Sequence, residues 1–160
     1  MRIVLVTGGA RSGKSAFAEG KVLSMPGRPV YVATAEAFDA EMADRIALHR
    51  SRRDSRWLQR DAPLDMLQAL IETDGQGPRL VDCLTLWLSN LMMNHRDWLA
   101  EATALVSTVR ELSAPVVFVT NEVGLGIVPD NRLARDFRDA QGRLNQMVAT
   151  VADEAWFLVS

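Results

Sequence analysis

The segment Gly8-Gly9-Ala10-Arg11-Ser12-Gly13-Lys14-Ser15 constrains this chain more than any other part of its sequence. It fits the pattern G-x-x-x-x-G-K-[ST], in which a glycine-rich turn cradles the phosphates of a nucleotide. The residues before it, Ile3–Thr7, form an apolar run of strand length, and a helical pattern opens at Lys14. Because the motif requires this order of strand, turn and helix, we expect a phosphate loop here rather than a glycine-rich turn with an exposed lysine.

The chemistry of such a loop assigns a role to each of its positions. Glycines let the backbone curl so that successive N–H groups point at phosphate oxygens, and the following helix presents its positive end to the same anion. We expect Lys14 to reach the β- and γ-phosphates as a catalytic residue, and the hydroxyl of Ser15 to bind Mg²⁺. All eight loop residues are therefore candidate nucleotide ligands.

A phosphate loop of this kind usually works with an acidic residue on the metal side, at the end of a nearby strand. The apolar run Arg79–Asp82 ends in such a carboxylate. Asp82 also stands where it could cap the helix expected after it. We favour the metal-side role, because the loop already demands such a partner.

Short apolar runs alternate with longer helical patterns along the chain. Strands are expected at Ile3–Thr7, Val30–Ala33, Arg79–Asp82, Val116–Thr120 and Trp156–Val159. Helices are expected at Lys14–Met25, Ala40–Arg53, Pro63–Thr73, Thr85–Asn94, Asp97–Leu112 and Asn131–Ala152. This alternation predicts an α/β fold of the RecA-like P-loop NTPase type, with a mostly parallel sheet flanked by helices. Residues 1–160 are expected to form a single nucleotide-binding domain.

Charge and cysteine content exclude several classes of protein. Eighteen basic and twenty acidic residues give a net charge of −2, which argues against a protein that coats nucleic acids. The one cysteine, Cys83, forbids an intramolecular disulfide and an all-cysteine zinc site. No apolar run reaches the roughly 20 residues of a membrane span, and the N-terminus is typical of a first strand rather than a signal peptide. We therefore expect a cytoplasmic protein that has no membrane span and does not bind nucleic acid.

The segments after the strands do not match a guanine-reading switch. Ras-like GTPases carry Asp-x-x-Gly and Asn-Lys-x-Asp at these places, whereas here Asp82 precedes Cys83-Leu84-Thr85 and Asn121 precedes Glu122-Val123-Gly124. A GTPase switch is therefore disfavoured.

A histidine among arginines is the second informative feature. On a helix, Arg45, His49, Arg52 and Arg53 share a face by their spacing. Positive neighbours favour the neutral imidazole, which is a competent nucleophile toward phosphorus, and the arginines would hold the phosphates of the attacked nucleotide. The alternative is a solvated basic face that happens to include a histidine. We expect the neighbouring apolar side chains Phe38, Met42 and Ile46 to anchor the helix.

The segment Asn121–Pro129 follows a strand, which places it at the sheet edge where α/β proteins bind ligands. We hypothesise that Glu122 binds the acceptor substrate or orients its hydroxyl. Beyond it, three arginines repeat at a spacing of three residues and would either meet phosphates or pair with Asp136 and Asp139. These arginines are Arg132, Arg135 and Arg138.

Together these motifs resemble those of the bifunctional adenosylcobinamide kinase / adenosylcobinamide-phosphate guanylyltransferase family of cobalamin biosynthesis. The resemblance covers nearly the whole chain in the family's order. It rests on Thr7–Ser15, Tyr31–Ala35, Asp39–His49, Asp82–Thr85, Thr120–Pro129, Asn131–Arg135 and Phe137–Gln146.

The resemblance implies two reactions. A nucleoside triphosphate (ATP or GTP) phosphorylates the aminopropanol hydroxyl of adenosylcobinamide, and GMP is then transferred from GTP to that phosphate through a guanylyl-histidine, here His49. It also favours a homo-oligomer and implies nucleotide contacts beyond the loop, in addition to the Mg²⁺ that the loop motif already places at Ser15 and Asp82. Those contacts fall on Ala33, Thr34, Ala35, Arg50, Ser51, Arg52, Arg53, Asp61 and Asp82. Where the family more often has Glu, this chain has Asp61.

Two other functions stay open on the sequence. One is a RecA-like nucleotide-dependent switch or ATPase, which would form no covalent nucleotide. The other is a small-molecule kinase without the transferase step, in which His49 and its arginines would only clamp phosphates.

Overall fold

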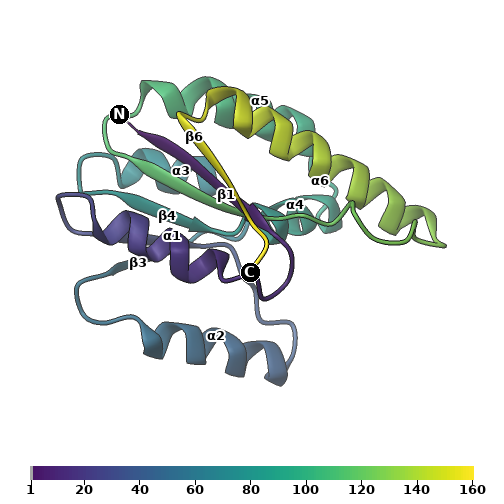
Figure 1. The fold of residues 1–160 in the computed structure, drawn as a ribbon, viewed down its shortest axis with the longest axis horizontal. Coiled ribbons are helices and arrows are strands. Elements are labelled where there is room, and N and C mark those ends of the chain that lie inside the picture. The colour runs from purple at the N-terminus through teal and green to yellow at the C-terminus, as the bar shows by residue number, and fades with distance from the viewer. Residues whose placement is uncertain (1) are drawn as a thin grey trace.

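The computed structural model describes residues 2–160, which contain a six-stranded, all-parallel sheet with helices on both faces (Figure 1). Its strands are β1 (Ile3–Gly8), β2 (Val30–Ala33), β3 (Leu58–Asp61), β4 (Arg79–Asp82), β5 (Val116–Asn121) and β6 (Glu154–Leu158). They lie in the order β3-β2-β4-β5-β1-β6. Strand β5 therefore lies between β1, which leads into the phosphate loop, and β4, which ends in Asp82. The predicted α/β class is confirmed.

The helices follow the expected positions to within a few residues. They are α1 (Lys14–Leu23), α2 (Ala40–Arg52), α3 (Met66–Glu72), α4 (Leu84–Met93), α5 (Trp98–Thr108), a short 3₁₀ helix η1 (Val109–Glu111) and α6 (Arg132–Val151). Capping side chains fix where α2 and α6 begin. Asp39 accepts the backbone N–H of Met42 at the start of α2, and Asn131 accepts that of Ala134 at the start of α6.

The sequence missed one strand, β3, because its pattern is polar. Residues Gln59 to Asp61 are exposed, and β3 pairs only with β2 at the edge of the sheet. Strands that are buried on both faces show apolar runs, whereas an edge strand of four residues needs none. The register of β3 places Asp61 beside Ala33, and β4 places Asp82 on the other side of the same residue.

Alternate side chains of the central strands enter two separate cores. Ile3 and Leu5 of β1 point to the larger core, which α3, α4, α5 and α6 cover. Val4 and Val6 point to the smaller core, which is closed by α1 through Ala18 and Val22. The strongly apolar helix α4 belongs to the first core, where its Trp87 is fully buried.

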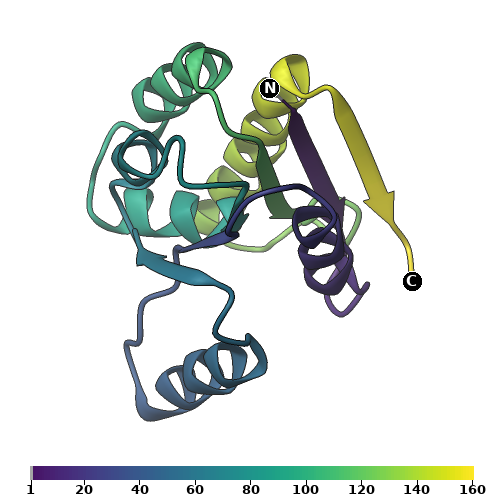
Figure 2. The ribbon, with the colours of Figure 1, turned by 90° about the vertical axis from the view of Figure 1, so that its left-hand side faces the viewer.

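Helix α2 stands apart from these layers. Figure 2 shows it beyond the sheet, joined to the body by the chain segments at its two ends. None of its residues, all of which the structure describes, is buried. Met42 and Ile46 are half-buried, as an anchoring face requires, but the expectation for Phe38 was wrong, since 66% of its surface is exposed.

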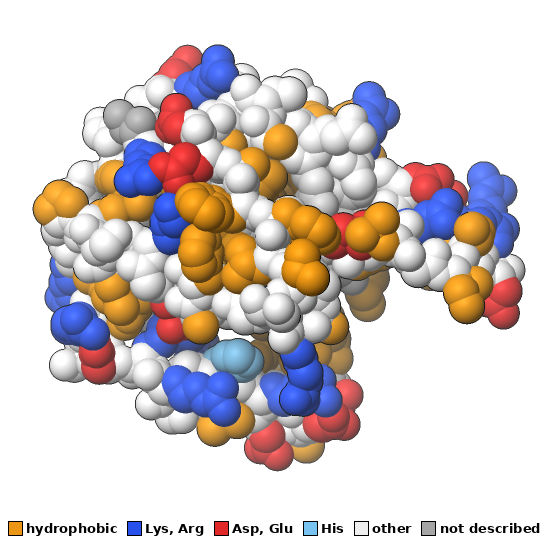
Figure 3. All heavy atoms as spheres, in the orientation of Figure 1, with side chains coloured by type: hydrophobic (Ala, Val, Ile, Leu, Met, Phe, Trp, Pro, Cys, Tyr) orange, Lys and Arg blue, Asp and Glu red, His pale blue; other side chains and the backbone are white. Residues whose placement is uncertain are grey.

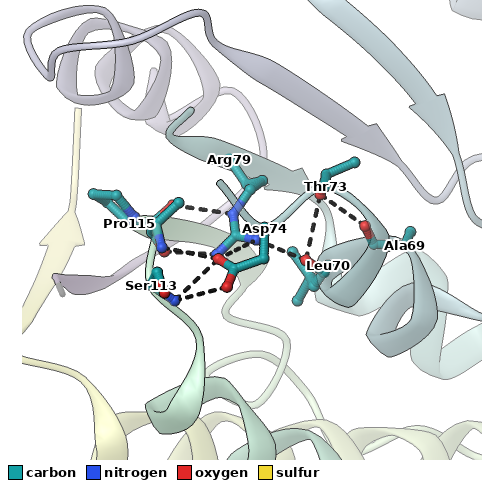
Figure 4. Close-up of polar contacts among 8 residues, drawn as sticks. Ala69, Leu70, Thr73, Asp74, Arg79, Ser113 and Pro115 are labelled. Carbon is teal, nitrogen blue, oxygen red and sulfur yellow. Dashed lines mark hydrogen bonds and ion pairs between the residues drawn. The ribbon is translucent and has the colours of Figure 1, made fainter. Parts of the chain in front are cut away.

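A buried arginine fixes the opposite end of the sheet from the phosphate loop (Figure 4). The guanidinium of Arg79 is fully buried, donates to the carbonyls of Leu70 and Ala114 at 2.6 Å each, and lies 3.2 Å from Asp74. Asp74 in turn accepts the backbone N–H groups of Ser113 and Ala114. These contacts tie the turn before β4 to the turn before β5, so they hold the two strands that carry Asp82 and Asn121.

Candidate active site

The phosphate loop turns sharply between β1 and α1. Arg11 and Gly13 adopt left-handed backbone angles, with φ of 55° and 84°, and Gly13 caps α1. Gly8 must be a glycine, because a Cβ there would lie 2.6 Å from the carbonyl oxygen of Leu158 and from the hydroxyl of Ser12. The side chain of Lys14 folds back over the loop and donates to the carbonyl of Gly9 at 3.0 Å.

Asp82 lies beside this loop and accepts two hydroxyl groups. The Oδ2 atom of its carboxylate receives a hydrogen bond from Tyr31 at 2.7 Å and a longer one from Ser15 at 3.3 Å. Asp82 does not cap the next helix: Cys83 is the cap, and its Sγ lies 3.5 Å from the N–H of Leu86. The alternative reading of Asp82 as a helix cap is therefore excluded.

The pair of Ser15 and Asp82 suits Mg²⁺ by its chemistry. Both provide hard oxygen ligands, and Mg²⁺ characteristically takes one or two carboxylates together with phosphate oxygens and water. Within residues 2–160 no cluster of three or more His, Cys, Asp or Glu side chains could hold a metal alone. An ion at this place would consequently rely on the oxygens of a bound nucleotide.

Tyr31 is a site residue to which sequence reasoning gave no role of its own. Burial, reinforced by the neighbouring charge of Asp82, raises the pKa of its phenol well above the ordinary value, so the hydroxyl remains a donor. The guanidinium carbon of Arg53 lies 3.5 Å from the centre of its ring, and Trp57 packs edge-on against it. The sequence could have pointed to Tyr31 in one way: it is a tyrosine, with a polar hydroxyl, within the apolar run of a predicted buried strand.

His49 and Asp82 line one cavity of about 180 Å³ between α2 and the sheet. The cavity is bounded by side chains from β2, α2, β3, β4 and α4 and from the segments that flank α2. They are Tyr31, Ala33, Ala35, Met42, Arg45, Ile46, His49, Arg50, Arg53, Gln59, Asp82 and Leu86. Figure 3 shows basic side chains gathered over α2 beside a hollow between that helix and the body. The structure thus brings His49 and most of the predicted arginines to the side of the sheet that carries Asp82.

The arginines on α2 and at its C-cap have different partners. Arg50 is bound by Asp61 through both carboxylate oxygens, at 2.9 and 2.7 Å. Burial alone would raise the pKa of Asp61, but hydrogen bonds from Gln59 and Arg50 outweigh it and lower the pKa. Arg45 pairs with Glu41 at 2.6 Å, one helical turn away. Arg53 is not part of the helix but its extended C-cap, which lets its side chain turn back over Tyr31.

A further acidic group, Glu19, reaches this region from α1. Burial raises the pKa of its carboxyl, and the charge of Asp82 adds to the rise, while Arg53 and His49 oppose it. Glu19 lies one turn after Ser15 on the same helix, and no role was predicted for it.

Three further predicted nucleotide contacts, Thr34, Ser51 and Arg52, are not among the residues that line the cavity. The hydroxyl of Thr34 is buried and bonds both to the carbonyl of Cys83, at 2.7 Å, and to its N–H, at 2.8 Å. It therefore connects the ends of β2 and β4 rather than facing the cavity. Ser51 and Arg52 are exposed at the end of α2, where the hydroxyl of Ser51 donates to the carbonyl of Leu48.

Glu122 lies at the end of β5, where its backbone N–H donates to the carbonyl of Gly8 at 2.9 Å. Its carboxylate accepts the N–H groups of Gly124 at 2.6 Å and Leu125 at 3.2 Å. Glu122 therefore shapes the loop that leaves the site beside the phosphate loop.

The three arginines of α6 pair locally. Arg132 contacts Asp136 at 3.6 Å and Arg138 contacts Asp139 at 3.2 Å, while Arg135 donates to the carbonyl of Pro129. Arg132 and Arg138 therefore form the expected pairs with Asp136 and Asp139, whereas Arg135 binds a backbone carbonyl.

Comparison with known proteins assigns the chain to a protein family. The model of the family described as cobinamide kinase / cobinamide phosphate guanyltransferase matches residues 4–160. The chain is 41% identical over 175 residues to the bifunctional adenosylcobalamin biosynthesis protein CobU of Salmonella typhimurium, covering 99% of this chain and 96% of that protein. It is 42% identical over 161 residues to the corresponding protein CobP of Pseudomonas aeruginosa, with 98% and 92% covered. In residues 2–160, no helix has both the length and the apolar character that crossing a bilayer demands.

Proposed function

The chain belongs to the cobinamide kinase / cobinamide phosphate guanyltransferase family, and from this premise we propose that His49 carries the guanylyl group between its two reactions. The protein is a bifunctional enzyme of cobalamin biosynthesis. The observation that supports our assignment is that His49 lines one cavity with Asp82, which lies at the phosphate loop.

In the kinase reaction, the aminopropanol hydroxyl of adenosylcobinamide attacks the γ-phosphorus of a nucleoside triphosphate. A bond forms between that oxygen and phosphorus, the bond to the β-phosphate oxygen breaks, and the hydroxyl proton is lost to solvent. Lys14 and the loop N–H groups bind the phosphates and stabilise the charge that develops on them. Ser15 and Asp82 would hold Mg²⁺, which supplies charge neutralisation at the leaving phosphate when bound.

In the second reaction, an imidazole nitrogen of His49 attacks the α-phosphorus of GTP, and pyrophosphate leaves as the bond to the β-phosphate breaks. The phosphate of adenosylcobinamide phosphate then attacks the same phosphorus, releases the imidazole and gives adenosylcobinamide-GDP. Two displacements replace one, and the histidine is regenerated. Arg50 and Arg53, which share the cavity with His49, are placed to bind the phosphates during transfer.

Labelling with [α-³²P]GTP tests this assignment. The wild type is expected to acquire one acid-labile, alkali-stable label, whereas [γ-³²P]GTP leaves none, and addition of adenosylcobinamide phosphate discharges the label into product. His49→Ala should not label. The matched control is His95→Asn at the other histidine, where φ is 55° and asparagine tolerates that angle.

Label that persists in His49→Ala would refute the assignment. A protein that hydrolyses nucleotide but never labels would instead be a switch or ATPase, and one that phosphorylates cobinamide without labelling would be a kinase alone.

The exposed apolar side chains beyond β5 support a homo-oligomer, as the family resemblance implies. Leu125 is 80% exposed, Ile127 97% and Leu133 72%. Exposed apolar clusters of this kind commonly mark protein interfaces. A cytoplasmic location is consistent with enzymes that draw on ATP and GTP.

A further inference from the structure

Tyr31 connects the two halves of the active site. Its ring lies in the smaller core with 5% of its surface exposed, and strand β2, which carries it, is adjacent to β4. From this position its hydroxyl reaches Asp82 at 2.7 Å, while the face of its ring meets the guanidinium of Arg53 at 3.5 Å. One side chain therefore contacts both the metal-side carboxylate and the end of the helix that bears His49.

The hydroxyl determines how the carboxylate of Asp82 is used. Within residues 2–160, the carboxylate of Asp82 accepts hydrogen bonds from Tyr31 and Ser15, and both reach its Oδ2 atom. This arrangement leaves Oδ1 available as a ligand atom and keeps the carboxylate beside Ser15. Carboxylates that bind metals are usually oriented by such a hydrogen-bonded neighbour, and its loss weakens metal binding.

The ring acts on the other half of the site. Arg53 is the C-cap of α2 and follows His49 by four residues. Its guanidinium lies on the face of Tyr31 and also donates to Gln59 at 2.9 Å. Since no residue of α2 is buried, contacts at its two ends and along its cavity face hold the helix, and the stacking of Arg53 is one of them.

We propose that Tyr31 is a positioning residue that serves both reactions, its hydroxyl fixing Asp82 for the metal and triphosphate and its ring fixing Arg53 and the end of α2. This inference rests on the proposed function, because it takes the cavity to be the place where GTP reacts. The two contacts are separable by substitution: Tyr31→Phe removes the hydroxyl and keeps the ring, whereas Tyr31→Leu removes both.

The first measurement needs no catalysis. GTP binding is followed by calorimetry at a series of Mg²⁺ concentrations in a His49→Ala background, which prevents transfer. We expect Tyr31→Phe to require about tenfold more Mg²⁺ for half-maximal binding. The control is Val32→Ala, the next residue on the same strand, whose fully buried side chain faces the other core. It should lower the melting temperature without changing the Mg²⁺ dependence, as any merely structural substitution would.

The second measurement is labelling with [α-³²P]GTP at saturating Mg²⁺, with His49 present. Tyr31→Phe should label at least about tenfold faster than Tyr31→Leu, because only the phenylalanine ring preserves the stacking on Arg53. An unchanged Mg²⁺ dependence in Tyr31→Phe, or equal labelling by the two variants, would overturn the proposal. A wild type that never labels would refute the role of His49, while the Mg²⁺ titration would still decide the role of the hydroxyl.

Discussion

The ammonium group of Lys14 lies 3.0 Å from the carbonyl oxygen of Gly9, so the backbone of the loop holds it over the residues that we propose bind phosphates. Replacing Lys14 with alanine removes the positive charge that we propose stabilises the transferring phosphoryl group. We expect the turnover of the kinase reaction to fall by about 100-fold or more in steady-state assays.

The other lysine provides a matched control for that substitution. Lys21 pairs with Glu154 at 2.9 Å and lies over the ring of Trp156, outside the site. Lys21→Ala should therefore retain wild-type turnover. Kinase activity that survived in Lys14→Ala would contradict the phosphate-loop mechanism.

Neighbouring glycines of the loop should respond differently to the same change. A Cβ at Gly8 would lie 2.6 Å from the backbone oxygen of Leu158, whereas one at Gly9 would meet no atom within 4 Å. Gly8→Ala is therefore expected to lower the free energy of unfolding by about 1–3 kcal/mol, and Gly9→Ala to leave it nearly unchanged. Urea denaturation of both variants measures the difference, and equal stabilities would show that the loop backbone yields to the added methyl group.

The contacts of Asp74 predict an acid-dependent part of the stability. Burial alone would raise the pKa of its carboxyl, but the N–H groups of Ala114 and Ser113 and the charge of Arg79 lower it. A carboxyl whose pKa is lower in the folded state stabilises the fold above the pKa of the unfolded chain, about 3.9 for aspartate. That contribution is lost as the pH falls through the lower, folded value.

Asp74→Asn should consequently be less stable than the wild type at pH 7, by about 1.5–3 kcal/mol, because the buried guanidinium of Arg79 loses a charged partner. The difference should stay constant down to about pH 5 and shrink at lower pH, where the wild type also becomes protonated. Urea titrations at several pH values measure it. A stability difference between the two proteins that grew as the pH fell would contradict the lowered pKa of Asp74.

The sequence predicted the central strands well because they are buried on both faces. The expected and observed bounds of β2 and β4 agree, since an apolar run in a parallel sheet begins and ends where burial does. Strand β3 was missed, and with it the fact that Asp61, Ala33 and Asp82 end neighbouring strands in one row. A short edge strand with polar, exposed side chains has no apolar run by which it could be predicted.

Motifs identified the site, but contacts between distant residues did not follow from them. The loop and Asp82 were predicted to act together, and Ser15 does bond to Asp82. Nothing in the spacing indicated that Asp61 would bind Arg50, or that the hydroxyl of Tyr31 would reach Asp82. These pairs depend on strand order and on the place of α2, which periodicity does not determine.

Glu122 provides the test of the acceptor side of the site. Its carboxylate accepts two backbone N–H groups, those of Gly124 and Leu125, and the amide of glutamine offers only one oxygen to them. Glu122→Gln should loosen the loop beside the phosphate site, so that kcat/KM for cobinamide phosphorylation falls about tenfold. Labelling by GTP alone should stay within about twofold of the wild type, because the hydrogen bonds that this carboxylate accepts within residues 2–160 come from this loop. Glu111→Gln, at an exposed residue of the 3₁₀ helix η1, is the control and should change neither reaction. If Glu122→Gln left both half-reactions unchanged, this residue would have no part in binding cobinamide.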